Sequence, residues 1–126
     1  MANSGAKIKW LDDSETHNYP AALSYLTLIL SPGKAGDIVA RLRAAKVSEF
    51  KAKDIFRASA LSLLGVSNSH VDRDKSKIVK GEPLSPILLV RDPAHGKVII
   101  ADGYHRLCAL YSFDEDASVR CKICDC

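Results

Sequence analysis

Hydrophobic residues in the first third of the chain recur at helical spacing. Leu26 and Leu30 lie in a stretch that is apolar every three or four positions, which predicts a helix over residues 20–30 with Pro20 at its first position. A Ser-Pro-Gly break follows this stretch. The same spacing then predicts a second helix over residues 33–46, with its cations toward the C-terminal end, where the helix dipole favours them.

The second half of the chain carries two continuous apolar runs instead. The runs over 86–90 and 98–101 predict strands that are covered on both faces. A turn sequence over 92–96 joins them closely enough for a hairpin. Shorter patterns predict the remaining elements, which are a strand over 47–50, a helix from 54 to 64, a helix over 70–80 that Asn68 or Ser69 caps and Gly81 ends, a helix over 104–113 and a strand over 119–123.

Together these elements predict one α+β domain in which helices flank a small mixed sheet. The length of 126 residues fits a single domain that can bury a sizeable core. Residues 1–46 are expected to form an N-terminal arm, docked through Trp10, and a helical extension. Residues 47–126 are expected to form the compact unit, and no repeat or linker-like tract divides the chain.

Composition and charge narrow the classes of function. The chain is 47% hydrophobic and 26% charged, which excludes a disordered or collagen-like protein. Its net charge of +3 and pI of about 8.7 fall short of a dedicated nucleic-acid binder, so nucleic acid is expected to bind only weakly and without sequence preference. The longest mostly apolar stretch, residues 21–30, is too short to span a membrane, and no signal peptide is recognisable. We therefore expect a cytoplasmic protein with no membrane partner.

Three of the four cysteines crowd the last six residues, at Cys121, Cys124 and Cys126. In the cytosol they are expected to be free thiols. Structural zinc usually needs four ligands, and a strand would direct Cys121 and Cys124 to opposite faces. We therefore expect no zinc, and we expect Cys121 to lie in the core.

The densest chemical signal is the segment 99–109, where a buried strand runs directly into a helix. The unpaired amides at a helix N-terminus bind anions, and Gly103 would let a phosphate approach the backbone closely. Arg106 can hold phosphate oxygens through two hydrogen bonds, and His105 can donate another. These residues predict a phosphate site at the start of the helix over 104–113.

Asp102 has two competing interpretations. As an N-cap it would accept an amide hydrogen bond from Tyr104 or His105, with Arg106 a surface cation and no ligand present. As a functional residue it would repel a bare phosphate, so it would either hold a bridging Mg²⁺ ion or act as a base. The residues alone leave both interpretations open.

The run Asp-Gly-Tyr-His-Arg at 102–106, between a strand and a helix, resembles the signature of the ParB/sulfiredoxin superfamily. The stretch 81–90 is similar to the Gly-x-x-x-Pro-Ile-x-Val strand of ParB N-terminal domains. The stretch 50–55 is similar to the entry segment of small bacterial proteins labelled as ParB-like nuclease domains. The resemblance covers roughly residues 47–124, and residues 1–46 match nothing in that superfamily.

The resemblance implies a ParB/sulfiredoxin-like fold and a nucleotide or phosphate held by Gly103, His105 and Arg106, to which we add Tyr104 as a candidate. Members include partition proteins that hydrolyse nucleoside triphosphates, sulfiredoxins, a free-serine kinase and reported nucleases, and the fold alone does not choose among them. Sulfiredoxins carry a cysteine where this chain has Tyr104. The printed sequence ends without the helix-turn-helix of partition proteins. The kinase matches better, because its motif also places an acid at the position of Asp102.

A second charged cluster follows the first predicted strand. Lys53 and Arg57 would either reach the same anion as Arg106 or, in the simpler interpretation, remain on the surface with Arg57 paired to Asp54. The other cations and histidines are expected to be solvated or without chemistry, and these are His17, His70, His95, Lys75, Lys77 and Lys80.

We therefore predict a nucleotide- or phosphate-binding protein with three candidate functions. The first is a Mg²⁺-assisted nucleoside triphosphatase or phosphotransferase, with Asp102 and His105 as catalytic residues and Asp102 as the metal ligand. The second is a non-enzymatic module that binds nucleotides or nucleic acid. The third is a ParB-like nuclease, for which Glu49 or Asp54 would have to supply a second metal-binding carboxylate. The sequence leaves the nucleotide, the acceptor and the oligomeric state open.

Overall fold

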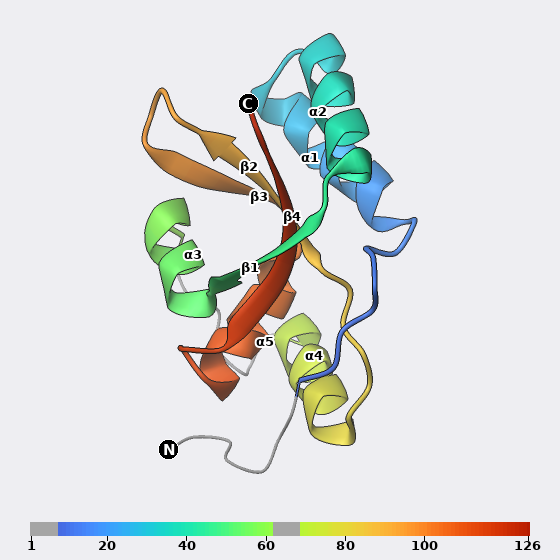
Figure 1. Ribbon diagram of the computed structural model, residues 1–126, viewed down its shortest axis with the longest axis vertical. Coiled ribbons are helices and arrows are strands. Elements are labelled where there is room, and N and C mark those ends of the chain that lie inside the picture. Colours follow the sequence, from blue (N-terminus) through green and yellow to red (C-terminus); the bar gives the residue numbers. More distant parts are fainter. Residues whose placement is uncertain (1–7, 62–68) are drawn as a thin grey trace.

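The computed structural model describes residues 8–61 and 69–126 (Figure 1). Its centre is one mixed sheet of four strands, in the order β1-β4-β2-β3. Strand β2 runs antiparallel to β3 and parallel to β4, and β4 runs antiparallel to β1. The strands are β1 (Val47–Lys51), β2 (Ile87–Asp92), β3 (Lys97–Asp102) and β4 (Ser118–Asp125). The predicted α+β class, mixed sheet and 92–96 hairpin are confirmed.

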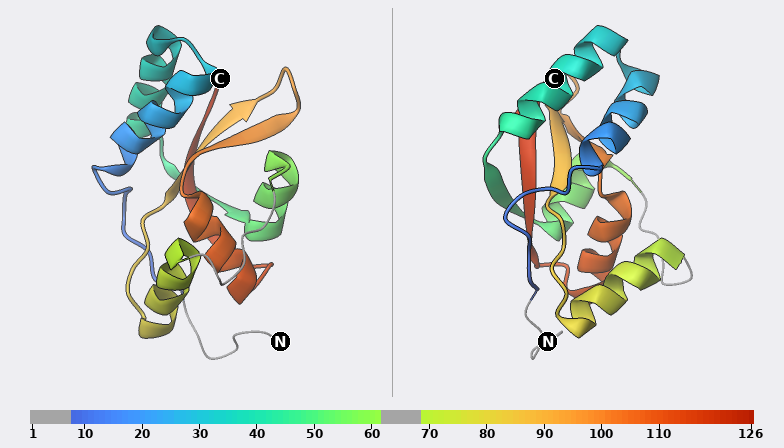
Figure 2. Two further views of the ribbon diagram at one scale, coloured as in Figure 1. Left: turned by 180° about the vertical axis from the view of Figure 1, so that it is seen from behind. Right: turned by 90° about the vertical axis from the view of Figure 1, so that its right-hand side faces the viewer.

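Helices lie on both sides of this sheet. They are α1 (Asn18–Ile29), α2 (Pro32–Ala44), α3 (Ala52–Ser59), α4 (Ser69–Lys80) and α5 (Tyr104–Phe113). Helices α1 and α2 lie on one side, whereas α3 and α5 lie on the other, with α4 packed against α5 (Figure 2). Along β2, Ile87 and Leu89 join the core under α3 and α5, while Leu88 and Val90 join the core under α1 and α2. The strand is therefore covered on both faces, as its continuous apolar run predicts.

Two helix boundaries differ from the sequence prediction. Helix α1 begins at Asn18, so Pro20 is its third residue rather than its first. The first four amides of a helix have no partner within it, so a proline there removes no helical hydrogen bond. Helix α3 ends at Ser59, because Ala60 adopts a left-handed conformation with φ of 58°. The predicted continuation to residue 64 and the Asn68 cap fall outside the described residues.

Gly81 ends α4 as predicted. It has a φ of 74°, a conformation that glycine adopts without a steric penalty. Its amide donates to the carbonyl of Ile78 (3.1 Å), and the amide of Glu82 donates to the carbonyl of Lys77 (2.9 Å). These bonds satisfy the last carbonyls of the helix and turn the chain toward β2.

The N-terminal arm lies along the segment that leads into β2 (Figure 1). The amide of Leu11 donates to the carbonyl of Leu84 (2.8 Å), and the amide of Leu84 donates to the carbonyl of Lys9 (2.9 Å). Trp10 packs against the hydrophobic core, as the arm's docking residue should. This pairing carries Glu15 and His17 to the place where β3 enters α5.

Cys121 is fully buried, as predicted, and burial raises the pKa of its thiol to about 12. Cys124 and Cys126 are half-buried on the opposite side of the sheet, against the α1 and α2 core. None of the helices in the described part of the chain has both the length and the apolar character that a membrane crossing requires.

Candidate functional site

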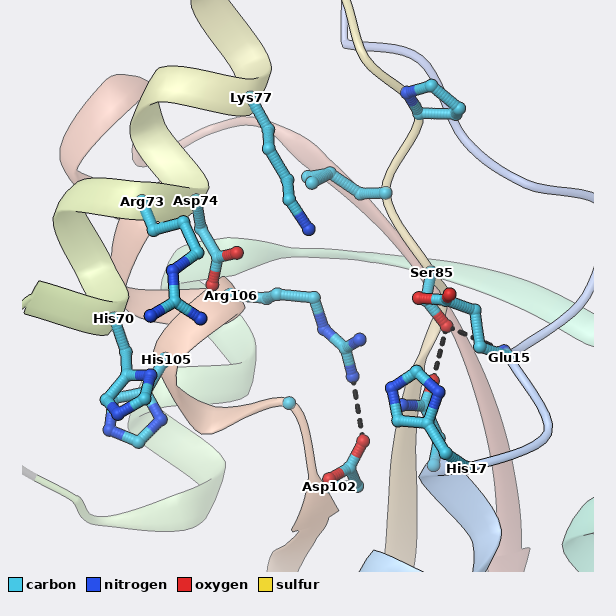
Figure 3. A pocket seen from close by; sticks show the side chains of 14 residues that line it. Glu15, His17, His70, Arg73, Asp74, Lys77, Ser85, Asp102, His105 and Arg106 are labelled. Carbon is cyan, nitrogen blue, oxygen red and sulfur yellow. Dashed lines mark hydrogen bonds and ion pairs between the residues drawn. The ribbon is translucent and has the colours of Figure 1, made fainter.

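A pocket of about 280 Å³ lies where the end of β3 meets α4, α5 and the N-terminal arm (Figure 3). One wall comes from α4, and the floor comes from the turn between β3 and α5. The opposite wall comes from the arm and the segment before β2. The charged and imidazole side chains that line the pocket are Glu15, His17, His70, Arg73, Asp74, Lys77, Asp102, His105 and Arg106.

Gly103 makes the tight turn from β3 into α5. Its φ is 109°, in the region that favours glycine, and it is the N-cap residue of α5. A Cβ atom at this position would lie 2.5 Å from Cγ2 of Ile87 and 2.8 Å from Nη2 of Arg106. Packing against Ile87 therefore already requires a glycine here, whether or not a phosphate approaches the backbone.

Asp102 is not the N-cap of α5, so the capping interpretation is wrong. Its Oδ2 accepts a hydrogen bond from Nη2 of Arg106 across the first helical turn, at 2.9 Å (Figure 3). The two side chains are only 21% and 13% exposed, so Arg106 is not a surface cation either. A pair this well buried is screened far less than a surface ion pair.

The guanidinium of Arg106 has an unused donor. Its Nε is buried and has no hydrogen-bond partner among the described residues. A buried N–H without a partner costs free energy, and such a group in a pocket is commonly satisfied by water or a ligand. Arg106 therefore combines a fixed position with hydrogen-bonding capacity that the described protein atoms do not fill.

Two carboxyl groups flank Arg106, and both have raised pKa values. Burial raises the pKa of Asp102, and the nearby Arg106 and His17 only partly offset it. Burial also raises the pKa of Asp74, against the opposing effects of Arg106 and Lys77. These two groups hold their protons to higher pH than an ordinary aspartate does, and raised values of this kind are frequent at functional sites.

Helix α4 supplies four of the pocket's polar side chains from a single face. His70, Arg73, Asp74 and Lys77 follow the i, i+3, i+4, i+7 spacing of one helical stripe (Figure 3). His70 is exposed and Lys77 is half-buried, and both line the pocket, which the sequence did not predict. The ring of His70 lies against that of His105, with centroids 4.9 Å apart. The stripe is visible in the sequence, but only the packing of α4 on α5 shows which face it occupies.

The arm supplies the opposite wall. The hydroxyl of Ser85 donates to Oδ1 of Asn18 and accepts from the amide of Glu15 (3.0 Å), which ties the arm to the entry of β2. His17 lies in an exposed turn, as expected, and its side chain is beside Asp102 and lines the pocket (Figure 3). Sequence reasoning missed this wall because an arm without periodicity carries no signal of where it docks.

Some predicted site residues lie elsewhere. Lys53 pairs with Asp116 at 2.7 Å, and Arg57 pairs with Asp54 at 3.8 Å. Both cations belong to α3 and neither lines the pocket, which corrects the expectation that they reach the same anion as Arg106.

Two further candidate residues, Tyr104 and Glu49, make contacts that belong to the fold rather than to the site. The ring of Tyr104 packs against the core, and burial raises the pKa of its hydroxyl. Glu49 pairs with Arg120 at 3.7 Å on the sheet edge, so it supplies no second carboxylate beside Asp102. Asp74 lines the α4 side of the pocket instead.

The residues present fit a metal ion poorly. Within residues 8–61 and 69–126, no three histidine, cysteine or carboxylate side chains are grouped so that they could hold one. Asp102 is already the partner of Arg106, so a Mg²⁺ ion would have to compete with the guanidinium. We therefore derive no step through a metal ion.

Comparison of the chain with protein-family models, with curated proteins and with solved structures finds no match. The geometry of the pocket is therefore the basis for a functional assignment.

Proposed function

We propose that the pocket binds a phosphate-bearing ligand such as a nucleotide. The observation that carries this is the convergence of Arg73, Lys77 and Arg106 on one pocket, with a buried Arg106 donor left without a partner among the described residues. Guanidinium groups form strong, charge-assisted hydrogen bonds to phosphate oxygens. The first amides of α5 also face the site of an anion, since a helix N-terminus carries partial positive charge.

A catalytic role is the second candidate, and the two raised carboxyl pKa values favour it. A carboxyl group that retains its proton nearer to neutral pH suits general acid–base chemistry. In a hydrolase or phosphotransferase, Asp102 would accept the proton of the attacking hydroxyl or water, His105 would assist proton transfer, and Arg106 would stabilise charge on the phosphoryl oxygens. The nuclease alternative has no comparable supporting observation among the described residues.

The finer fold assignment is also a proposal. We assign the domain to the ParB/sulfiredoxin type because the motif at 102–106 lies where β3 runs directly into α5. Helices α1 and α2, which lie outside the resemblance, would then be an addition that covers Leu88 and Val90.

Calorimetric titration tests the binding proposal. Inorganic phosphate and each nucleoside triphosphate are titrated into the protein, with and without Mg²⁺. Arg73→Gln and Arg106→Gln are each expected to weaken binding by about tenfold or more, the effect of losing a charge-assisted hydrogen bond. Arg57→Gln is the matched control, because that side chain is 83% exposed on α3 and outside the pocket. If no phosphate compound binds, or if all three variants bind equally well, the proposal is wrong.

Asp102→Asn separates an enzyme from a binding module. The variant keeps the shape of the side chain and removes its charge and basicity. As a catalytic residue, it should bind Mg²⁺-free nucleotide at least as well as the wild type and lose about a hundredfold or more in turnover. Equal turnover in the two proteins, or none in the wild type, would leave the binding module as the function.

A further inference from the structure

The pocket contains balanced formal charge. Three side chains are permanent cations, namely Arg73, Lys77 and Arg106, and three are carboxylates, namely Glu15, Asp74 and Asp102. Their formal charges cancel when all three carboxylates are ionised. A dianion that enters this pocket would therefore bring two excess negative charges, and a proton that enters with it would remove one of them.

Histidine side chains are placed to take up that proton. His70 from α4 and His105 from α5 lie with ring centroids 4.9 Å apart, and His17 lies across the pocket beside Asp102 (Figure 3). Histidine changes its charge closest to neutral pH. Two imidazolium rings in contact would repel each other, so the pair is suited to take up one proton rather than two.

The groups around the histidine pair come from every side of the pocket. On α4 they are Arg73, Asp74 and Lys77, and on α5 the neighbour is Arg106. Asp102 ends β3, and Glu15 and His17 belong to the arm and the start of α1. Cations and carboxylates are equally numerous around the pair before a ligand enters. An incoming anion adds negative charge and shifts that balance toward protonation.

The number of donors points to a particular kind of phosphate group. Guanidinium, ammonium and imidazole groups converge from α4 and α5, and the three free oxygens of a terminal phosphate offer them more acceptor sites than the two free oxygens of a phosphodiester. A terminal phosphate group has three free oxygens and carries up to two negative charges. The volume of about 280 Å³ lies at the lower end of small-ligand pockets, which also suits a terminal group rather than a polymer backbone.

We propose, building on the function above, that the pocket selects dianionic terminal phosphate groups over phosphodiesters and binds them together with about one proton, taken up by the His70–His105 pair. The ligand class is thus a phosphate monoester or the end phosphate of a nucleotide. Internal phosphates of nucleic acid, each a monoanion, are excluded. For an anion whose own charge does not change near neutral pH, affinity rises as the pH falls through the neutral range, by about tenfold per pH unit for each proton taken up.

The test uses anions that do not titrate near neutral pH. Sulfate, a dianion, and methyl sulfate, a monoanion, are titrated calorimetrically in two buffers of equal pH and different ionisation enthalpy. A heat that differs between the buffers measures protons taken up by the protein. We expect sulfate to bind with uptake of about one proton at pH 7, and methyl sulfate to bind at least about tenfold more weakly. Methyl phosphate and dimethyl phosphate repeat the comparison with phosphate chemistry.

Histidine variants show which side chains take up the proton. Combining His70→Gln with His105→Gln should abolish most of the uptake, whereas His95→Gln should not, because His95 pairs with Asp92 in the hairpin turn outside the pocket. Uptake that persists in the double variant and disappears in Asp74→Asn would overturn the assignment to the histidines. Should the double variant not fold, the wild-type preference for sulfate and its buffer-dependent heat still decide the proposal.

The outcomes also separate this inference from the proposed function. Binding of phosphate compounds with no proton uptake, or with equal affinity for the monoanion, would overturn the inference and leave the phosphate site standing. Absence of binding by every dianion tested at every pH would overturn both.

Discussion

Lys122 and Arg106 are both largely buried cations that pair with an aspartate, but their hydrogen bonding differs. Nζ of Lys122 donates to Oδ1 of Asp13 (2.9 Å), to the hydroxyl of Tyr19 (2.9 Å) and to the carbonyl of Arg43 (2.8 Å). All three protons of the ammonium group are therefore used. Burial alone would lower the pKa of Lys122, but the hydrogen bonds to Tyr19 and Asp13 outweigh it and raise the pKa.

The guanidinium of Arg106 uses its hydrogen-bond donors less completely. It donates to Asp102 through Nη2, and its buried Nε has no partner among the described residues. The Lys122 network joins the arm, α1, α2 and β4, whereas Arg106 faces a pocket. A saturated network rigidifies a structure, and an unsaturated one retains donors for a ligand. Hydrogen-bond saturation therefore distinguishes the structural cation Lys122 from Arg106, the cation that we propose to bind a ligand.

Among these variants, Gly103→Ala should lower the unfolding free energy the most. It disturbs the pocket without changing a charge. The new methyl group would clash with Ile87 and strain a residue with a φ of 109°. We expect unfolding free energy to fall by about 3 kcal/mol. Urea denaturation measures this, with Gly36→Ala as control. Nothing among the described atoms lies within 4 Å of a Cβ on Gly36 in α2, so that variant should be neutral or slightly stabilising.

Lys122→Met should destabilise the fold and spare the pocket. Methionine retains the apolar length but leaves the carbonyl of Arg43 without its donor and removes the ion pair with Asp13, while the Ser85 hydrogen bonds still hold the arm at the pocket. The expected loss of unfolding free energy is about 2 kcal/mol. Phosphate affinity of the folded protein should be unchanged. Lys46→Met, at an exposed position, is the control, and equal stability of the two variants would contradict the structural role.

Arg106→Met should show the opposite balance. We expect a smaller loss of stability, about 1 kcal/mol, because Asp102 can protonate once its partner is gone. Phosphate binding should fall by at least about tenfold. Denaturation and calorimetry on the same preparation make the comparison with Lys122→Met direct. A variant that binds phosphate normally but unfolds easily would make Arg106 a second structural cation.

The two partner aspartates should give the smallest effects, with opposite signs against pH. The hydrogen bond from Lys122 lowers the pKa of Asp13, so its stabilisation is present above pH 3.8 and is lost as the pH falls below that value. Burial raises the pKa of Asp102, so its ionised form costs stability at neutral pH, and this cost disappears as the pH falls toward 3.8.

Urea titrations between pH 7 and pH 3 compare Asp13→Asn and Asp102→Asn with the wild type. The deficit of Asp13→Asn should shrink as the pH falls below 3.8. As the pH falls from 7 toward 3.8, the unfolding free energy of Asp102→Asn should decrease relative to that of the wild type. Parallel curves for the two variants would show that the aspartates do not differ in environment.

Most of the fold could be predicted because its signals are local. Helical spacing before residue 46, continuous apolar runs after residue 85 and Gly81 each reflect the burial or backbone geometry of a few neighbouring residues. The same holds for the turn at 102–106, where a strand, a glycine and a helix follow directly. The order of strand, glycine and helix along the sequence therefore identifies four candidate residues that the pocket brings together, namely Asp102, Gly103, His105 and Arg106.

The composition of the pocket walls depended on contacts between distant segments. His70, Arg73, Asp74 and Lys77 share a helix face in the sequence, but a solvated face has the same spacing, and only the packing of α4 on α5 places it along the pocket. Lys53 and Arg57 carry the charge that a phosphate needs, yet α3 places them away from the pocket. The sequence left Asp102 open between a cap and a metal ligand or base, and it did not predict the ion pair, because that depends on where the Arg106 side chain folds. Local pattern specifies which residues can form a helix or a turn. Long-range packing sets the neighbours of a charged side chain, and those neighbours determine the chemistry of that side chain.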